Sequence, residues 1–195
     1  MVYFVLGGSA SGKSEYAEQL AVKLMESGSA AGIYIATMRR SASAGERIRK
    51  HVERRRGLGF ETLENEILIL SETDRDKIRG AVVLLEDLPN LLANRMFDRD
   101  EHVKQDEKGT AALSEESTLE AKEKSWLLEG LKEDIKCLSE SAKSLILVSG
   151  DIFRDGMHYD EKTEEYIENL GDLHRWLAGK ADQTVEVVCG IPISD

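Results

Sequence analysis

The chain has 195 residues, with 26 Lys and Arg against 37 Asp and Glu and a formal net charge of −11. A chain of this length can bury a full hydrophobic core, so we expect one domain over residues 1–195 that needs no disulfide or metal to fold. The acidic total excludes a general nucleic-acid binder, because neutralising phosphates requires a positive surface.

The apolar segments and the cysteines indicate a cytoplasmic protein without a membrane span. The longest apolar runs, such as 81–85 and 145–148, fall far short of the ~20 residues that a membrane span needs. No basic region precedes the first apolar segment, as it would in a secretory signal. Cys137 and Cys189 are too few for a disulfide framework, which agrees with a reducing compartment.

Short apolar runs alternate along the chain with longer stretches of helical periodicity, which is typical of βαβ units and a mostly parallel sheet flanked by helices. The predicted elements, in chain order, are strand 2–6, helix 13–27, strand 33–36, helix 44–56, strand 81–85, helix 88–97, helix 116–141, strand 145–149, helix 162–178 and strand 184–188. The run 67–70 is too short to distinguish a strand from the edge of a helix. The charged stretch 98–124 has few large apolar residues, so we expect a solvated loop leading into a helix, inserted in the single domain.

A phosphate-binding loop follows the first predicted strand. Its residues are Gly7, Gly8, Ser9, Ala10, Ser11, Gly12, Lys13 and Ser14, which fit G-x-x-x-x-G-K-[ST] between a strand and a helix. The glycines let backbone N–H groups turn towards phosphate oxygens, and the helix adds the positive end of its dipole. We expect Lys13 to contact the β- and γ-phosphates as a catalytic residue and the Ser14 hydroxyl to bind Mg²⁺.

A P-loop also needs a carboxylate at the end of a neighbouring strand to hold the Mg²⁺. Glu86 closes the apolar run 82–85, and ligands gather at the carboxyl ends of parallel strands. Glu86 is therefore the predicted metal carboxylate and Asp87 the fallback, while a solvated strand terminus is the alternative interpretation.

A basic segment interrupts the acidic average. Between residues 39 and 56, eight Arg and Lys stand against two Glu. Arg47, His51 and Arg55 are spaced four apart on a predicted helix, so their side chains share one face. Cationic neighbours lower the pKa of a histidine and keep it neutral, which is the form that can attack phosphorus. The alternative is a basic, solvated helix with an idle histidine, and the pattern alone leaves both open.

An ordered series of motifs resembles a known family. The series comprises the loop 7–14, the strand 33–37, Arg47-Ile48-x-x-His51-x-x-x-Arg55, Thr62-x-Glu64, Leu84-Leu85-Glu86 with Asn94 downstream, and Val188-x-Gly190-Ile191-Pro192. It resembles the bifunctional adenosylcobinamide kinase and adenosylcobinamide-phosphate guanylyltransferase family of cobalamin biosynthesis, over nearly the whole chain. The resemblance implies a RecA-like P-loop fold and a homo-oligomer, expected to be a trimer.

Two reactions are implied by this resemblance. ATP or GTP phosphorylates the aminopropanol hydroxyl of adenosylcobinamide, and GTP then guanylylates a histidine that passes GMP to the new phosphate. By resemblance, His51 is the guanylylated nucleophile and Glu86 holds guanosine, the metal, or both. The remaining nucleotide-binding positions implied by the family, beside the P-loop, are Thr37, Met38, Arg39, Arg47, Val52, Glu53, Arg54, Arg55 and Glu64.

The sequence departs from the family pattern in two places near its C-terminal end. Gly150 and Asp151 stand where the family has Asn-Glu, and His174 stands where it has Asn. From its pattern on an apolar helix, His174 is expected to be a satisfied, semi-buried residue. The alternatives for function are a P-loop kinase of another small molecule, and a nucleotide-binding homologue that has lost one or both activities.

Overall fold

The computed structural model describes residues 1–39, 49, 52–53, 55–106, 116–153 and 156–194, with side chains for all of these except 98–106 and 116–126. The strands are β1 (Val2–Gly7), β2 (Gly32–Ala36), β3 (Phe60–Glu64), β4 (Val82–Glu86), β5 (Ser144–Gly150), β6 (Gln183–Val188) and β7 (Ile191–Ser194). The helices are α1 (Lys13–Gly28), α3 (Glu72–Ile78), α4 (Leu88–Asp106), α5 (Glu116–Ser141) and α6 (Glu161–Ala178).

The strands form one seven-stranded sheet in the order β3-β2-β4-β5-β1-β6-β7. Every neighbouring pair is parallel except the β6–β7 hairpin. The fold class predicted from the sequence is confirmed: the sheet is mostly parallel, helices flank it, and the P-loop strand β1 is separated from β4 by the inserted strand β5. The carboxyl ends of β1, β2 and β4 therefore meet at one edge of the sheet.

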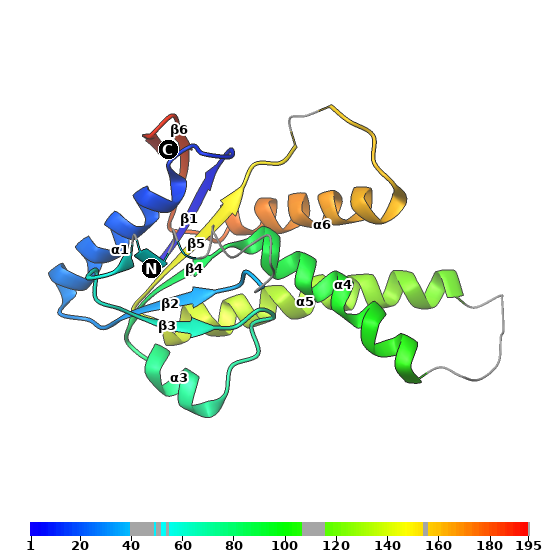
Figure 1. The fold of residues 1–195 in the computed structure, drawn as a ribbon, viewed down its shortest axis with the longest axis horizontal. Helices are drawn as coiled ribbons and strands as arrows, with labels where there is room; N and C mark the ends of the chain where they lie inside the picture. Colours follow the sequence, from blue (N-terminus) through cyan, green and yellow to red (C-terminus); the bar gives the residue numbers. More distant parts are fainter. Residues whose placement is uncertain (40–48, 50–51, 54, 107–115, 154–155, 195) are drawn as a thin grey trace.

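Helices cover both faces of the sheet, with α1 on one side and α4, α5 and α6 on the other (Figure 1). Side chains alternate along each strand, so one strand supplies two cores. Val82 and Leu84 of β4 pack in the core under α1, whereas Val83 and Leu85 pack in the core shared with α4 to α6. The same alternation turns Glu86 towards the α1 face, where the P-loop lies.

Several elements differ from the sequence-based expectation. Strands β3 and β7 and helix α3 were not predicted, because β3 and β7 are largely exposed and carry no continuous apolar run. The ambiguous run 67–70 is neither helix nor strand. Helix α4 continues through Asp106 into the stretch expected to be a loop, while α5 matches the helix predicted over 116–141. Of the predicted helix 44–56, residues 49, 52, 53 and 55 are helical and the rest lie outside the described residues, apart from Arg56 in a turn.

Among the residues that the structure describes, no helix has the length and apolar character needed to cross a membrane.

Candidate nucleotide site

The loop between β1 and α1 has the backbone shape of a phosphate-binding loop. Gly12 adopts φ 91°, a left-handed conformation that favours glycine, and it is the N-cap of α1. Gly7 is equally constrained, since a Cβ there would lie 2.7 Å from the Val187 carbonyl oxygen. The Lys13 N–H at the start of α1 meets the Ser11 hydroxyl at 3.4 Å. Because the N-cap residue is a glycine, no side chain at that position covers the next N–H groups of the first turn, those of Ser14 and Glu15, which leaves them available to an anion. Lys13 donates from Nζ to the Gly8 carbonyl at 3.1 Å, across the loop.

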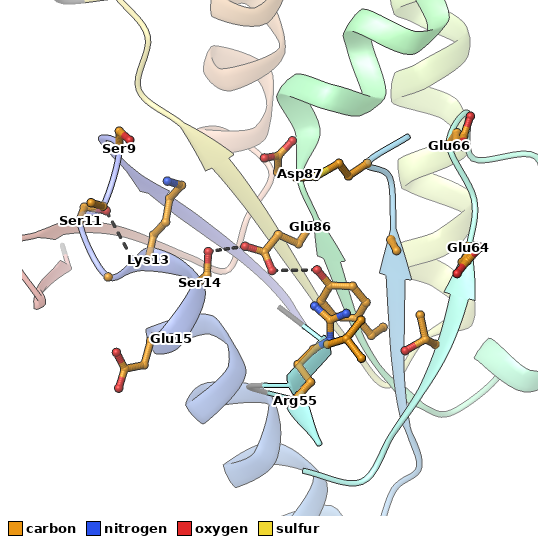
Figure 2. Close-up of a pocket in the computed structure, with 17 residues that line it drawn as sticks. Ser9, Ser11, Lys13, Ser14, Glu15, Arg55, Glu64, Glu66, Glu86 and Asp87 are labelled. Carbon is orange, nitrogen blue, oxygen red and sulfur yellow. Dashed lines mark hydrogen bonds between the residues drawn. The ribbon is translucent and has the colours of Figure 1, made fainter. Parts of the chain in front are cut away.

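A cavity of about 520 Å³ opens beside this loop at the carboxyl edge of the sheet. In Figure 2, Ser14 of the P-loop and Arg55 of the basic segment lie close to Glu86 of β4, while Glu64 of β3 lies on the far side of β2. The residues that line it are Ser9, Ala10, Ser11, Gly12, Lys13, Ser14, Glu15, Tyr34, Ala36, Met38, Val52, Arg55, Thr62, Glu64, Glu66, Glu86 and Asp87. The P-loop and part of the basic segment therefore share one cavity.

Glu86 joins the P-loop to the centre of the sheet. The Ser14 hydroxyl donates to Glu86 Oε1, and the Tyr34 hydroxyl donates to Glu86 Oε2 at 2.9 Å. Burial raises the pKa of Tyr34 above its usual value, and the negative charge of Glu86 raises it further, so the phenol stays protonated and acts as a donor. Glu86 is 7% exposed. Its carboxylate is thus held between the P-loop and β2.

Arg55 lies in the wall of the same cavity and is 8% exposed. Its guanidinium carbon stacks 3.4 Å from the centroid of the Tyr34 ring, which is a cation–π contact. Within the described part of the chain, its buried Nη1 has no hydrogen-bond partner. A buried guanidinium donor without an acceptor is costly, and an anionic ligand in the cavity would supply one.

The strand ends around the cavity are fixed by Thr37 and Asn94. The buried Thr37 hydroxyl donates to the Asp87 carbonyl and accepts from the Asp87 N–H, both at 2.8 Å. Asn94 on α4 donates to the Thr37 carbonyl at 2.8 Å and to the Glu66 carbonyl at 2.9 Å. These contacts hold the segments after β2, β3 and β4 in fixed positions relative to one another.

The residues present fit a magnesium ion. No group of three or more His, Cys, Asp or Glu side chains is arranged for a metal within the described ranges. A P-loop metal needs less from the protein, because nucleotide phosphates and water complete its shell. Ser14 and Glu86 bring a hydroxyl and a carboxylate oxygen into contact beside the loop, and both are ligands that Mg²⁺ prefers.

The structure brings most of the predicted site residues together. Eleven of them line the cavity: Ser9, Ala10, Ser11, Gly12, Lys13, Ser14, Met38, Val52, Arg55, Glu64 and Glu86. Gly7 and Gly8 form the loop without lining the cavity, and Thr37 acts as described above. Arg39 pairs with the cavity residue Glu66 at 3.2 Å, and Glu53 is exposed outside the cavity. Arg47, His51 and Arg54 lie outside the described residues.

Sequence reasoning missed Tyr34, Glu66 and Glu15 among the cavity residues. Tyr34 lies in the apolar strand 33–36 and reads as a core residue, although it is the one side chain of that run with a hydroxyl. Glu66 follows Glu64 by two residues, in a loop after β3. Its spacing from other residues forms no motif that would mark it as a site residue. What brings Tyr34 to the site is the pairing of β2 with β4. No pattern within a single strand of the sequence reveals that pairing.

The two departures in the C-terminal half meet in the structure. A buried hydrogen bond of 2.6 Å joins His174 Nε2 to the Ser149 hydroxyl, which directly precedes Gly150. The His174 ring also packs between Phe4 and Phe153. Burial lowers the pKa of His174 to about 4, with the Asp151 carboxylate opposing this in part. His174 is thus hydrogen-bonded, as expected, and with 8% of its surface exposed it is buried more deeply than the expected semi-buried position.

Comparison with known proteins identifies relatives of the whole chain. Residues 3–194 match the family model described as cobinamide kinase / cobinamide phosphate guanyltransferase. The bifunctional adenosylcobalamin biosynthesis protein CobP of Pseudomonas aeruginosa is 31% identical over 190 residues, covering 97% of this chain and 94% of that protein.

Two solved structures are similar at low identity. A KaiC-like protein from Pyrococcus horikoshii OT3 matches with a TM-score of 0.47 and 14% identity, over 95% of this chain and 69% of that one. The flagellar accessory protein FlaH from Methanocaldococcus jannaschii matches with a TM-score of 0.45 and 9% identity, over 95% of this chain and 70% of that one.

Proposed function

The chain belongs to the cobinamide kinase / cobinamide phosphate guanyltransferase family, and from this premise we propose that it carries out both reactions of that name in cobalamin biosynthesis. It phosphorylates the aminopropanol hydroxyl of adenosylcobinamide and then converts the phosphate to adenosylcobinamide-GDP with GTP. The observation that carries the proposal is the single cavity in which the P-loop and Glu86 face Val52 and Arg55 of the basic segment.

In the kinase step, the corrinoid hydroxyl oxygen attacks the γ-phosphorus of ATP or GTP. A new O–P bond forms, the bond from the γ-phosphorus to the β-bridging oxygen breaks, the nucleoside diphosphate leaves, and the hydroxyl proton passes to the solvent. The backbone of the loop 8–14 and Lys13 bind the β- and γ-phosphates. Ser14 and Glu86 are the residues that would hold Mg²⁺, which neutralises charge on the phosphate oxygens when bound.

In the guanylyl step, a neutral ring nitrogen of His51 attacks the α-phosphorus of GTP. An N–P bond forms, the bond to the bridging oxygen breaks, and pyrophosphate leaves. The phosphate oxygen of the corrinoid then attacks the same phosphorus and the N–P bond breaks, which returns a neutral histidine. Arg55 supports this step, because its Nη1, which has no hydrogen-bond partner among the described residues, can donate to the phosphate oxygens on which negative charge gathers.

Two features of the site bear on Glu86. Its Oε1 meets the Ser14 hydroxyl of the P-loop while Tyr34 holds its Oε2, which supports the metal-binding role over guanosine binding. Thr62 and Glu64 line the cavity from β3, a strand that is distant from the P-loop in the sequence. We assign the guanosine to the β3 side of the cavity.

The homotrimer and the cytoplasmic location stay predictions.

The experiment is to incubate the purified chain with adenosylcobinamide, Mg²⁺ and GTP and to separate the corrinoid products. We expect adenosylcobinamide phosphate to appear first and adenosylcobinamide-GDP to follow. His51→Asn should accumulate the phosphate and form no GDP product, because the kinase step does not use the histidine. Equal amounts of the GDP product from both proteins would overturn the role of His51. Phosphorylation of other alcohols without any corrinoid product would favour a kinase of another small molecule.

A further inference from the structure

One buried side chain touches both halves of the proposed site. Tyr34 on β2 is 3% exposed. Its hydroxyl donates to Glu86 Oε2 at 2.9 Å, and its ring carries the Arg55 guanidinium at 3.4 Å. The edge of the ring meets Phe60 of β3, with centroids 6.4 Å apart. A tyrosine that served packing alone would need neither of its two polar contacts.

The hydroxyl contact fixes the direction of Glu86. A carboxylate accepts at both oxygens, and here Oε2 is bound to Tyr34 while Oε1 meets the Ser14 hydroxyl. Without the phenol, the carboxylate could rotate away from Ser14, and Oε2 would lose a buried charge-assisted hydrogen bond. The Tyr34 hydroxyl thus fixes the direction in which Glu86 Oε1 points, towards the Ser14 hydroxyl of the phosphate loop.

The ring contact fixes Arg55 independently of the hydroxyl. Arg55 follows the candidate nucleophile His51 by four residues in the sequence. Its guanidinium carbon lies over the ring, 3.4 Å from the ring centroid, and a planar group held against a ring keeps its donors aimed in a set direction. Its Nη1 finds no hydrogen-bond partner among the described residues, so the Tyr34 ring is the main contact that orients it.

We propose that Tyr34 is a positioning residue for both reactions: its hydroxyl orients Glu86 for the metal–nucleotide complex, and its ring orients Arg55 for guanylyl transfer. The two roles use different parts of one side chain and can be separated by substitution. The ring role rests on the proposed function, whereas the hydroxyl role requires only that the P-loop binds a nucleotide with Mg²⁺.

The test compares Tyr34→Phe with Tyr34→Leu. Phe removes the hydroxyl and keeps the ring, while Leu removes both. One measurement titrates a fluorescent GTP analogue with and without Mg²⁺, and the other follows the rate at which GMP becomes attached to the chain at saturating GTP and Mg²⁺. Tyr3→Phe is the matched control, because Tyr3 is buried in the same core and its hydroxyl donates only to the Met1 sulfur, at 3.6 Å, among the bonds described.

For Tyr34→Phe we expect the affinity for the nucleotide to fall about tenfold with Mg²⁺ and to stay the same without it, the size of one hydrogen bond to a charged group. Its rate of GMP attachment at saturation should stay within about threefold of wild type, since Phe keeps a ring under Arg55. Tyr34→Leu should show the same loss of affinity and attach GMP at least about tenfold more slowly.

Arg55→Met should give the opposite pattern to Tyr34→Phe, and it replaces Tyr34→Leu if the Leu variant fails to fold. It removes the guanidinium but leaves the Tyr34 hydroxyl, so GMP attachment should slow while the effect of Mg²⁺ on nucleotide affinity stays as in wild type.

An effect of Mg²⁺ on nucleotide affinity that is the same in Tyr34→Phe as in wild type overturns the hydroxyl role. Equal GMP attachment by Tyr34→Phe, Tyr34→Leu and Arg55→Met overturns the ring role. If wild type attaches no GMP, the proposed function and the ring role fail together, and the Mg²⁺ titration still decides the hydroxyl role.

Discussion

At the scale of single residues, the site combines positions that only one residue type can fill with side chains that carry charge. Gly7 and Gly12 shape the loop, because a Cβ at the first would collide with the Val187 carbonyl and φ at the second is left-handed. Lys13 places a cation across the loop that these glycines form. Both glycines and Lys13 could be predicted from the sequence because one local motif contains them all.

Replacing Lys13 with Ala should lower nucleotide affinity by about a hundredfold, since the variant loses a charged donor to the β- and γ-phosphates. Titration with a fluorescent GTP analogue measures this. Lys23→Ala is the control, because Lys23 lies on the same helix at an exposed position. A loss of affinity of the same size in both variants would show that net charge, and not the phosphate loop, determines binding.

His174 makes stability depend on pH. Its folded-state pKa of about 4 lies below the ordinary value of 6.5, so between these values the unfolded chain takes up a proton that the folded chain refuses. The contribution of the neutral ring is complete above pH 6.5 and is lost as pH falls towards 4, by at most about 3 kcal/mol.

The measurement is urea unfolding of wild type and His174→Gln at several pH values from 4 to 7. The difference in the free energy of unfolding between the two proteins should shift in favour of the variant as pH falls, because Gln takes up no proton. Curves that run parallel over this range would contradict the buried neutral histidine.

At the scale of elements, the sequence predicted those strands and helices that bury an apolar face. The strands β1, β2, β4 and β5 are almost wholly buried, so their apolar runs are strong signals. The signal fails for β3, whose sequence Phe-Glu-Thr-Leu-Glu is largely exposed and which, among the described strands, pairs with β2 alone at the edge of the sheet. Pairing with a neighbour, and not local composition, makes this segment a strand.

Helix α3 was missed for a related reason. It has 7 residues and a capping box, in which the Ser71 side chain accepts from the Asp74 N–H and the Asp74 side chain accepts from the Ser71 N–H. The Ser71 hydroxyl also donates to Asp74 Oδ2 at 2.7 Å, and this bond, together with the one from the Ser71 N–H, lowers the pKa of the Asp74 carboxyl below its ordinary value. Isolated helices this short are marginal, so the cap contributes a large share of its local stability.

Replacing Ser71 with Ala should therefore destabilise the protein by about 1 kcal/mol, the usual cost of removing an N-cap side chain. Urea unfolding at neutral pH measures the change, and Ser139→Ala in the last turn of α5 is the control. The hydroxyl of Ser139 donates to the Lys136 carbonyl of its own helix and caps no N-terminus. Equal stability of wild type and Ser71→Ala would show that α3 is held by packing of Ile78 alone.

At the scale of the whole molecule, the sheet order creates the site. Glu86 and Ser14 are far apart in the chain, yet the placement of β5 between β1 and β4 leaves them in contact across the α1 face. Tyr34 enters from β2, on the other side of β4. The P-loop was evident in the sequence, but the partnership of Tyr34 with Glu86 and Arg55 depends on pairing between strands, so a linear motif could not reveal it.

The measurement that tests the central claim most directly is mass spectrometry of the intact chain after incubation with GTP and Mg²⁺ without a corrinoid. The account predicts one GMP per chain, mapped to His51, lost on exposure to acid and stable to alkali, and absent from His51→Asn. Subsequent addition of adenosylcobinamide phosphate should remove the GMP and yield adenosylcobinamide-GDP. Tight binding of GTP with no attached GMP, or GMP attached at another residue, would contradict it.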